Sequence, residues 1–174
     1  MLITRRFFYQ SIEMRTEQLN FEFDVYESSD ELPEKESELL KSARNITTKA
    51  YAPYSNFSVG AVALLNDGNT VSGTNQENAS YPVGTCAERV LLGTAAMLYT
   101  NIPIDTMAVS YHNANGESNR PISPCGMCRQ ALKEYEERTN QPIRIIMSGL
   151  KGKVYVLKTA GQLLPLSFGS IDLK

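Results

Sequence analysis

Three cysteines in two short clusters constrain this 174-residue chain more than any other feature. Cys86 stands alone, and Cys125 and Cys128 follow together later in the chain. An odd and small number of cysteines argues against the disulfide framework of a secreted domain. The spacing favours either a metal site in a reducing compartment or three buried thiols that act as small hydrophobic side chains. On spacing alone, both interpretations stay open.

Length and charge exclude several further classes of protein. A chain of 174 residues suits one globular domain, and a composition of 42% hydrophobic residues is too apolar for a disordered chain. Seventeen basic and nineteen acidic side chains leave a formal net charge of -2, which gives no electrostatic footprint for a long polyanion. No apolar run approaches the roughly 18 to 20 residues that cross a bilayer. We therefore expect a soluble, cytoplasmic protein with no nucleic-acid partner and no membrane partner.

The N-terminal region differs in character from the rest of the chain. It begins with two arginines before any acidic residue, but no apolar segment or small-residue cleavage site of an export signal follows. Met14 is an alternative start, which would leave residues 1–13 as a disordered extension. The period-2 alternation of Phe21–Val25 predicts a short strand or an extended arm. We therefore expect an N-terminal extension over residues 1–30, flexible or arm-like, and one domain over residues 31–174.

The hydrophobic pattern of the domain alternates between helices and strands. We expect helices over 33–50, 84–99, 124–138 and 159–164, and strands over 57–65, 70–74, 104–111, 143–147 and 154–157. Pro33 suits the first turn of a helix, and Asn66–Asn69 suits a hairpin turn. This alternation predicts an α/β fold, a three-layer α-β-α arrangement with a mixed five-stranded central sheet.

Both cysteine clusters lie where a loop is expected to turn into a helix. Ser123 suits the N-cap and Pro124 the first helical position, so Cys125 and Cys128 become i,i+3 neighbours on one helical face. The partial positive charge of a helix N-terminus stabilises thiolates. Together with Cys86, these residues predict three thiolate ligands, which is typical of a catalytic zinc site whose fourth position holds water.

Two structural alternatives remain open at this point. A closed structural zinc site would need a fourth ligand, which His112, the only histidine, or a carboxylate would have to supply. Thr85, followed three residues later by Glu88, is also a capping box, so Glu88 has a structural interpretation beside a chemical one.

Several motifs in order resemble one enzyme family. C-A-E-R at 86–89 and P-C-x-x-C-R at 124–129 resemble the zinc-dependent cytidine deaminases. Three further motifs resemble the small, homotetrameric type of that family: Y-A-P-Y-S-x-F-x-V-G-A at 51–61, N-x-E-N-A-x-Y-P at 75–82 and L-L-P-x-S-F at 163–168. The resemblance covers about residues 35–174. It implies the cytidine deaminase fold and one Zn²⁺ per subunit.

The resemblance also implies a reaction and its main residues. Zn²⁺ held by Cys86, Cys125 and Cys128 lowers the pKa of its bound water. Glu88 carries a proton from that water to N3 of cytosine and, after hydroxide adds at C4, returns a proton to the departing amine. Cytidine and 2′-deoxycytidine become uridine and 2′-deoxyuridine with release of ammonia, a step of pyrimidine salvage. Since three thiolates make the centre anionic, we expect Arg89 to donate to a ligand sulfur.

The substrate contacts follow from the same resemblance. Asn75 and Glu77 are two residues apart, so their side chains face one way in extended backbone, and the family assigns them the ribose. Phe57 is expected beside the pyrimidine ring. The backbone N–H of Ala87 is expected at the base O2 and the Ser123 carbonyl at the leaving amine.

Subunit contacts are expected from Ala79, Tyr81 and Phe168, which would reach a neighbouring subunit's pocket in a homotetramer. Competing functions are deamination of a related aminopyrimidine nucleoside, RNA or DNA editing, and a non-catalytic zinc module. The ribose pair argues against the first of these, the near-neutral charge and lack of Trp against the second, and Glu88 against the third.

Overall fold

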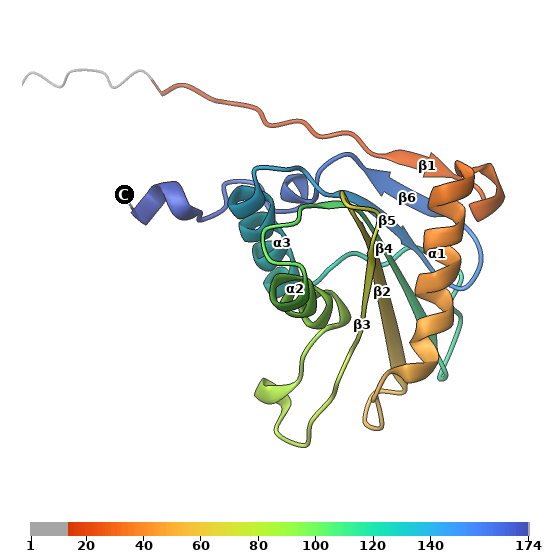
Figure 1. Ribbon diagram of the computed structural model, residues 1–174. Helices are drawn as coiled ribbons and strands as arrows, with labels where there is room; N and C mark the ends of the chain where they lie inside the picture. Colours follow the sequence, from red (N-terminus) through yellow and green to blue (C-terminus); the bar gives the residue numbers. More distant parts are fainter. Residues whose placement is uncertain (1–13, 174) are drawn as a thin grey trace, which may run out of the picture.

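The structure, a computed structural model, describes residues 14–173 (Figure 1). They build one six-stranded mixed sheet in the order β1-β6-β5-β4-β2-β3. The strands are β1 (Asp24–Tyr26), β2 (Phe57–Leu65), β3 (Thr70–Thr74), β4 (Ile104–Asn113), β5 (Arg144–Ser148) and β6 (Val154–Leu157). The helices are α1 (Glu34–Ile46), α2 (Ala87–Leu98) and α3 (Gly126–Thr139), with short 3-10 helices η1 (Ser29–Glu31), η2 (Thr47–Lys49), η3 (Tyr81–Val83), η4 (Ala160–Leu163) and η5 (Ser170–Leu173).

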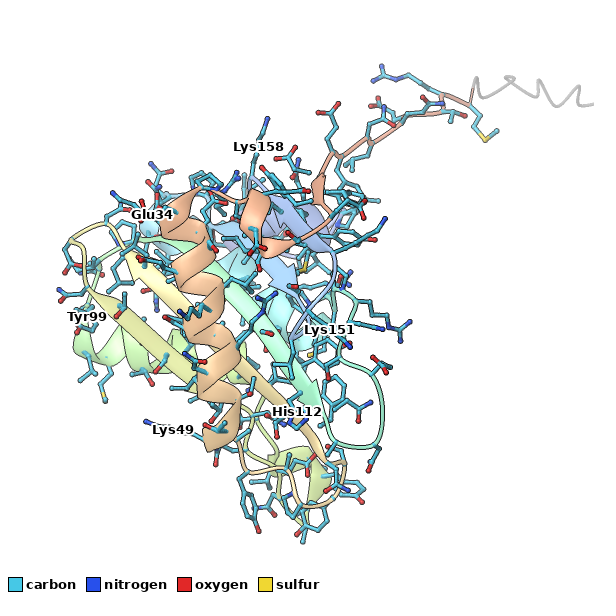
Figure 2. The ribbon with its side chains drawn as sticks, turned by 90° about the vertical axis from the view of Figure 1, so that its right-hand side faces the viewer. Glu34, Lys49, Tyr99, His112, Lys151 and Lys158 are labelled. Atoms are coloured by element: carbon cyan, nitrogen blue, oxygen red, sulfur yellow. The ribbon has the colours of Figure 1, made fainter. Side chains whose placement is uncertain are left out.

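Helices cover both faces of the sheet, which confirms the predicted three-layer α-β-α arrangement. α1 packs on β2 and β4 from one side, while α2 and α3 lie on the other side (Figure 1). Figure 2 views the α1 face, with Glu34 at the start of α1 and Lys49 at the end of η2. Leu91 and Leu132 belong to the buried cluster under α2 and α3, and Leu40 belongs to the cluster under α1.

The prediction of a five-stranded sheet is wrong by one strand. β1 adds a sixth, because Asp24–Tyr26 pairs antiparallel with β6, Val25 opposite Tyr155. The alternating Phe21–Val25 segment was open between strand and arm, and the structure contains both. Its last residues enter the sheet, and the preceding residues from Met14 onward run as exposed, irregular chain.

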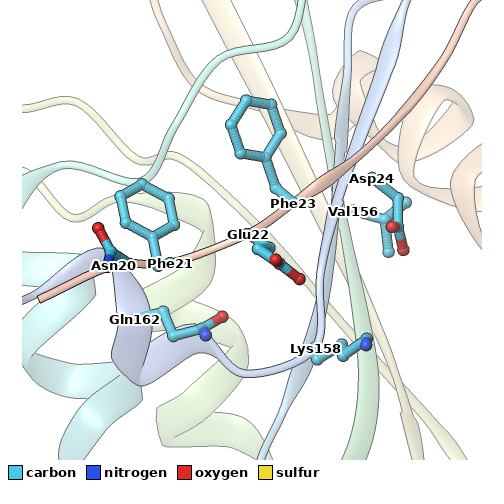
Figure 3. A pocket seen from close by; sticks show the side chains of 8 residues that line it. All are labelled: Asn20, Phe21, Glu22, Phe23, Asp24, Val156, Lys158 and Gln162. Atoms are coloured by element: carbon cyan, nitrogen blue, oxygen red, sulfur yellow. The ribbon is translucent and has the colours of Figure 1, made fainter.

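The predicted extension over residues 1–30 falls partly on residues 1–13, which lie outside the described part of the chain, so the prediction that residues 1–13 are a disordered extension before an alternative start at Met14 also concerns residues outside it. The described part of the arm packs over β6. The ring centroid of Phe23 lies 5.0 Å from that of Tyr155. Residues Asn20–Asp24 on one side and Lys158 and Gln162 on the other line a cavity of about 300 Å³ (Figure 3). β1 therefore joins the sheet although it lies before the predicted domain boundary.

Two connections place the strands that carry the site. β2 and β3 form an antiparallel hairpin whose turn contains Gly68 at φ +87° and an Asp67 carboxylate that accepts from the backbone N–H of Asn69. β4 and β5 are parallel, and parallel neighbours require a crossover, which α3 supplies. α3 therefore starts at the end of a long loop after β4, on the same face as α2.

The helix boundaries differ from the expected ones at the ends. α3 begins at Gly126 with Cys125 as its N-cap, so the prediction of Ser123 as N-cap and Pro124 as first helical residue is wrong by two positions. The first hydrogen bond of the helix runs from the backbone N–H of Arg129 to the Cys125 carbonyl, while the Pro124 carbonyl accepts from the Arg129 side chain at 2.8 Å. Across residues 14–173, every helix is too short or too polar to span a membrane.

Candidate metal centre and active site

Two helix N-termini meet at the cysteine clusters. Cys86 is the N-cap of α2 and Cys125 is the N-cap of α3, both in extended backbone conformation. Their sulfur atoms lie 3.6 Å apart, so these side chains face each other across the gap between the two helices. Cys128, in the first turn of α3, places its sulfur 3.5 Å from that of Cys125. The predicted convergence of three thiols is therefore confirmed.

The sulfur spacing fits a zinc ion. All three Sγ atoms lie within 4.8 Å of one another. Tetrahedral Zn²⁺ with Zn–S bonds of about 2.3 Å brings neighbouring sulfurs to about 3.8 Å. Within residues 14–173, this ligand group contains no fourth Cys, His, Asp or Glu, and His112 lies in β4 opposite Ser58. The geometry therefore favours three protein donors with an open fourth position over a closed structural site.

The thiols of Cys86 and Cys128 differ in pKa. A hydrogen bond from Cys128 lowers the pKa of Cys86 to about 6, and the positive charge of Arg89 acts in the same direction. The pKa of Cys128 is raised, because its proton is held between its own sulfur and the Cys86 thiolate. The cluster therefore contains a thiolate near neutral pH, and thiolates are the form that binds a soft divalent cation.

Glu88 lies in the first turn of α2, two residues beyond Cys86. It is only 4% exposed, and burial raises the pKa of its carboxyl above the ordinary value. The capping-box alternative fails, since Cys86 rather than Thr85 is the N-cap and the Thr85 hydroxyl donates to the Val83 carbonyl. The Glu88 carboxyl is therefore buried beside the cysteine cluster and does not cap the helix.

The two arginines that follow the clusters differ in their contacts. Arg89 was expected to donate to a ligand sulfur, but its Nη1 donates instead to the thioether sulfur of Met127 at 4.0 Å, and its charge lies close enough to Cys86 to affect that thiol. The side chain of Arg129 is part-buried. It donates to the Pro124 carbonyl at 2.8 Å and to the Leu163 carbonyl at 2.9 Å.

Gly73 on β3 sets how closely α2 approaches the sheet, and the sequence analysis missed it. A Cβ atom at this position would lie 2.4 Å from the Ala87 carbonyl oxygen and 2.5 Å from the Leu91 nitrogen. Only glycine therefore allows the first turn of α2 to rest on β3. Because this turn contains Glu88 and directly follows Cys86, the contact of α2 with Gly73 also determines how close Cys86 and Glu88 lie to the sheet.

Asn75 and Glu77 follow β3, and their side chains form hydrogen bonds with β2 and with the loop before β2. The Asn75 amide accepts from Val59 N at 2.7 Å and donates to the Phe57 carbonyl at 2.9 Å. The Glu77 carboxylate accepts from the Ser55 hydroxyl and from the backbone N–H groups of Tyr54 and Ser55. The Ser55 hydroxyl is the main cause that lowers the pKa of Glu77.

These contacts leave spare hydrogen-bonding capacity at both side chains. The second N–H of Asn75 and one of the roughly four acceptor positions of the Glu77 carboxylate are not used by the contacts above. Phe57, at the start of β2, stacks on Tyr111 with ring centroids 4.8 Å apart. Ala87 is fully buried, whereas Ser123 is exposed on the loop before Cys125.

The residues expected at a subunit contact are exposed. Tyr81 is 75% exposed and its ring meets that of Tyr54 edge-on at 6.1 Å. Ala79 is exposed on the same loop, and Phe168, in the segment between η4 and η5, is 59% exposed.

Comparison with known proteins places these features in a family. The model of the cytidine and deoxycytidylate deaminase zinc-binding region matches residues 33–141, which include all three cysteines. The chain belongs to this deaminase family. It is therefore a zinc-dependent hydrolytic deaminase, and the cluster of Cys86, Cys125 and Cys128 is able to hold one zinc ion.

Individual members of the family cover most of the chain. The cytidine deaminase of Halalkalibacterium halodurans is 36% identical over 135 residues, 78% of this chain and 95% of that protein. The cytidine deaminase of Mycobacterium tuberculosis is 33% identical over 146 residues, 82% of this chain and 96% of that protein. The crystal structure of the Burkholderia pseudomallei cytidine deaminase has 39% identity and a TM-score of 0.65, covering 75% of this chain and 97% of that chain.

Proposed function

We propose that this deaminase converts free cytidine and 2′-deoxycytidine to uridine and 2′-deoxyuridine, with water as the co-substrate and ammonia as the second product. The observation that carries the proposal is the buried Glu88 carboxyl beside three converging sulfurs at two helix N-termini. The printed names of the similar proteins, cytidine deaminases, support the choice of nucleoside. The proposal includes a role in pyrimidine salvage in the cytoplasm.

The chemistry divides between the metal and Glu88. When bound to Cys86, Cys125 and Cys128, zinc supplies a Lewis acid that makes water a nucleophile near neutral pH. Glu88 would accept one proton from the attacking water and deliver it to N3 of the ring, and would then take the second proton from the same oxygen and pass it to the amine that leaves C4. A carboxyl whose pKa is raised by burial suits this exchange, because a proton shuttle works best when its pKa lies near the operating pH.

Further side chains orient the nucleoside in this proposal. Asn75 and Glu77 bind the ribose hydroxyls through the donor and acceptor positions that the loop contacts leave over. Phe57, held by its stack on Tyr111, lies beside the pyrimidine ring. The backbone N–H of Ala87 binds O2 of the base and the Ser123 carbonyl accepts from the leaving amine. Arg89 reduces the negative charge of the thiolates.

We also propose a homotetramer with composite active sites. The exposed Ala79, Tyr81 and Phe168 support this proposal, because each is part of a motif of the small homotetrameric type and lies on the surface of the single chain. Sedimentation equilibrium tests it directly. A tetrameric mass and a fall of specific activity on dilution are expected, and a fully active monomer would contradict it.

The decisive test of the reaction is the Glu88→Gln variant. It should retain zinc but lose about 10²- to 10⁴-fold in kcat, the contribution typical of general acid–base catalysis. The loss of absorbance on conversion of cytidine to uridine measures turnover, and metal analysis measures zinc. Glu134→Gln is the matched control, since Glu134 is exposed on α3.

Assays with different substrates distinguish the alternative functions. Cytidine and 2′-deoxycytidine should both be deaminated, and a cytosine-containing oligonucleotide should not. Turnover of the oligonucleotide in preference to the nucleosides would favour an editing enzyme, and turnover only of a modified aminopyrimidine nucleoside would favour a specialised deaminase. An active Glu88→Gln variant would remove the proposed proton shuttle.

A further inference from the structure

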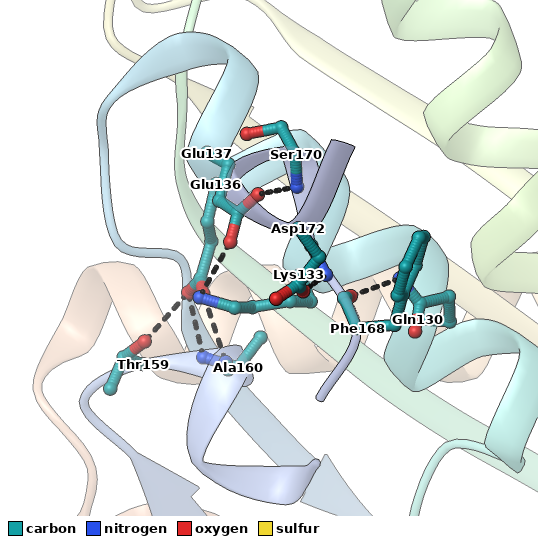
Figure 4. Close-up of polar contacts among 11 residues, drawn as sticks. Gln130, Lys133, Glu136, Glu137, Thr159, Ala160, Phe168, Ser170 and Asp172 are labelled. Atoms are coloured by element: carbon teal, nitrogen blue, oxygen red, sulfur yellow. Dashed lines mark hydrogen bonds and ion pairs between the residues drawn. The ribbon is translucent and has the colours of Figure 1, made fainter. Parts of the chain in front are cut away.

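The C-terminal segment lies along α3, the helix that has Cys125 as its N-cap and contains Cys128 in its first turn. Figure 4 shows polar contacts that join them over the length of the helix. At the start of α3, Arg129 donates to the Leu163 carbonyl. Near its end, the buried Glu136 carboxylate accepts from Thr159, Ala160 and Gly161. These contacts fix η4, and a second set fixes the chain beyond it.

The second set comes from one face of the helix. Gln130, Lys133 and Glu137 have the i, i+3, i+7 spacing that puts side chains in one row. Gln130 Nε2 donates to the carbonyl of Phe168 at 3.0 Å. Glu137 Oε2 accepts from the backbone N–H of Ser170 at 3.1 Å, and Glu137 Oε1 pairs with Lys133 Nζ at 3.1 Å.

The backbone at and just after Phe168 is therefore held, while its ring is not covered. Its own carbonyl and the amide of Ser170 are both bound to α3, yet the Phe168 side chain is 59% exposed. Leu166, just before it, is 97% exposed and has φ +53°, a conformation rarely adopted by a side-chain-bearing residue. Fixing such a segment costs conformational entropy that the exposed ring does not recover within the single chain.

We propose that Gln130, Lys133 and Glu137 form a positioning face, which holds Phe168 in a fixed place relative to the helix of the metal ligands. The inference rests on the proposed contact of Phe168 with a neighbouring subunit's pocket and names the residues that prepare this contact. A preorganised side chain binds more tightly than a mobile one, because its ordering does not have to be repeated at each binding event. The face acts through Phe168 and touches neither substrate nor zinc.

A double-mutant cycle tests this role. The first variant combines Gln130→Ala with Glu137→Ala, the second is Phe168→Ala, and the third joins both sets. Each of the first two should raise KM for cytidine by about tenfold, equivalent to about 1.4 kcal/mol of binding free energy, with a smaller change in kcat. The joined variant should show little further rise, since residues that act through one another are not additive.

Controls separate positioning from general stability. Glu134→Ala removes a carboxylate from a different position on α3 and should leave KM unchanged. Glu137→Gln keeps an acceptor for the Ser170 amide, so it should restore most of the affinity lost in Glu137→Ala. Zinc content and melting temperature are measured for every variant. If the double variant does not fold, the single Gln130→Ala and Glu137→Ala variants replace it in the cycle.

The outcomes distinguish this inference from the proposed function. If Phe168→Ala raises KM but the positioning-face variants do not, Phe168 retains its role and the positioning face is refuted. If Phe168→Ala leaves KM and oligomeric mass unchanged, the proposed subunit contact itself fails. If the rises in KM multiply in the joined variant, the face affects activity by a route other than Phe168, which also overturns the inference.

Discussion

The close approach of α2 to β3 gives the sharpest structural prediction. In Gly73→Ala, the new Cβ would lie 2.4 Å from the Ala87 carbonyl oxygen, where ordinary contacts begin at 3.4 Å. Relief requires a shift of about 1 Å, and because both obstructing atoms are backbone atoms, the helix itself has to move. Overpacking of this kind costs about 2 kcal/mol, which lowers the melting temperature of a chain of this size by about 4–8 °C.

The functional effect should exceed the loss of stability. The displaced turn contains Glu88 and follows Cys86 directly, so the proposed proton shuttle and the metal ligand Cys86 move together away from Cys125 and Cys128. A misplacement of about 1 Å in a catalytic group can cost about 10² in rate. We therefore expect Gly73→Ala to lose zinc during dialysis and to retain about one hundredth of the wild-type kcat when zinc is resupplied.

Gly93 provides a matched control on α2 itself. A Cβ there meets nothing within 4 Å, so Gly93→Ala adds the same methyl group without a clash. Alanine in a helix interior is favoured over glycine by about 0.5–1 kcal/mol, and the variant should melt at a higher temperature than wild type. Urea unfolding, metal analysis and the cytidine assay are run on both variants. Full zinc content and normal kcat in Gly73→Ala would refute the claim that the contact of α2 with Gly73 determines the positions of Cys86 and Glu88.

Three further predictions follow from the same structure. Glu136→Gln places an amide among four hydrogen-bond donors and should lower the free energy of unfolding by about 2–3 kcal/mol, measured in urea against Glu134→Gln, which should change little. The Ser170 amide lowers the pKa of Glu137, so the hydrogen bond between them is strong at neutral pH and weakens as the pH falls through that lowered pKa. The protection factor of the Ser170 amide should fall there in wild type but show no such step in Glu137→Gln. A zinc chelator should abolish activity and lower the melting temperature, with both restored by added zinc, and unchanged melting would argue against a metal held by the three cysteines.

The parts of the site that could be predicted from sequence are those fixed by local geometry. Two cysteines three residues apart share a helical face, and a helix start next to a cysteine is visible as a change in hydrophobic pattern. For this reason the convergence of Cys86, Cys125 and Cys128 was predicted and is confirmed. The three-layer arrangement followed equally from the alternation of helical and strand patterns.

Contacts between distant segments could not be predicted in this way. Gly73 lies in an ordinary strand pattern, and only the position of α2 shows why it has no side chain. Glu136 stands in a run of charged residues typical of a solvated helix face, yet it is buried because η4 folds back onto α3. The sequence left the segment of β1 open between a strand and an arm for a related reason. The formation of a three-residue strand depends on pairing with β6 more than on its own sequence.

The first turn of α2 shows how local and functional signals compete. Threonine followed three residues later by glutamate is a helix-start pattern, and on stability alone the carboxylate would lie outside, bonded to the N-cap amide. The structure instead makes Cys86 the N-cap and buries Glu88 beside the sulfurs, where burial disfavours its charged form. A buried acid without this purpose would be a liability for folding, because its desolvation is not offset by an ion pair. The loss of local capping and the burial of Glu88 therefore support its proposed role in proton transfer.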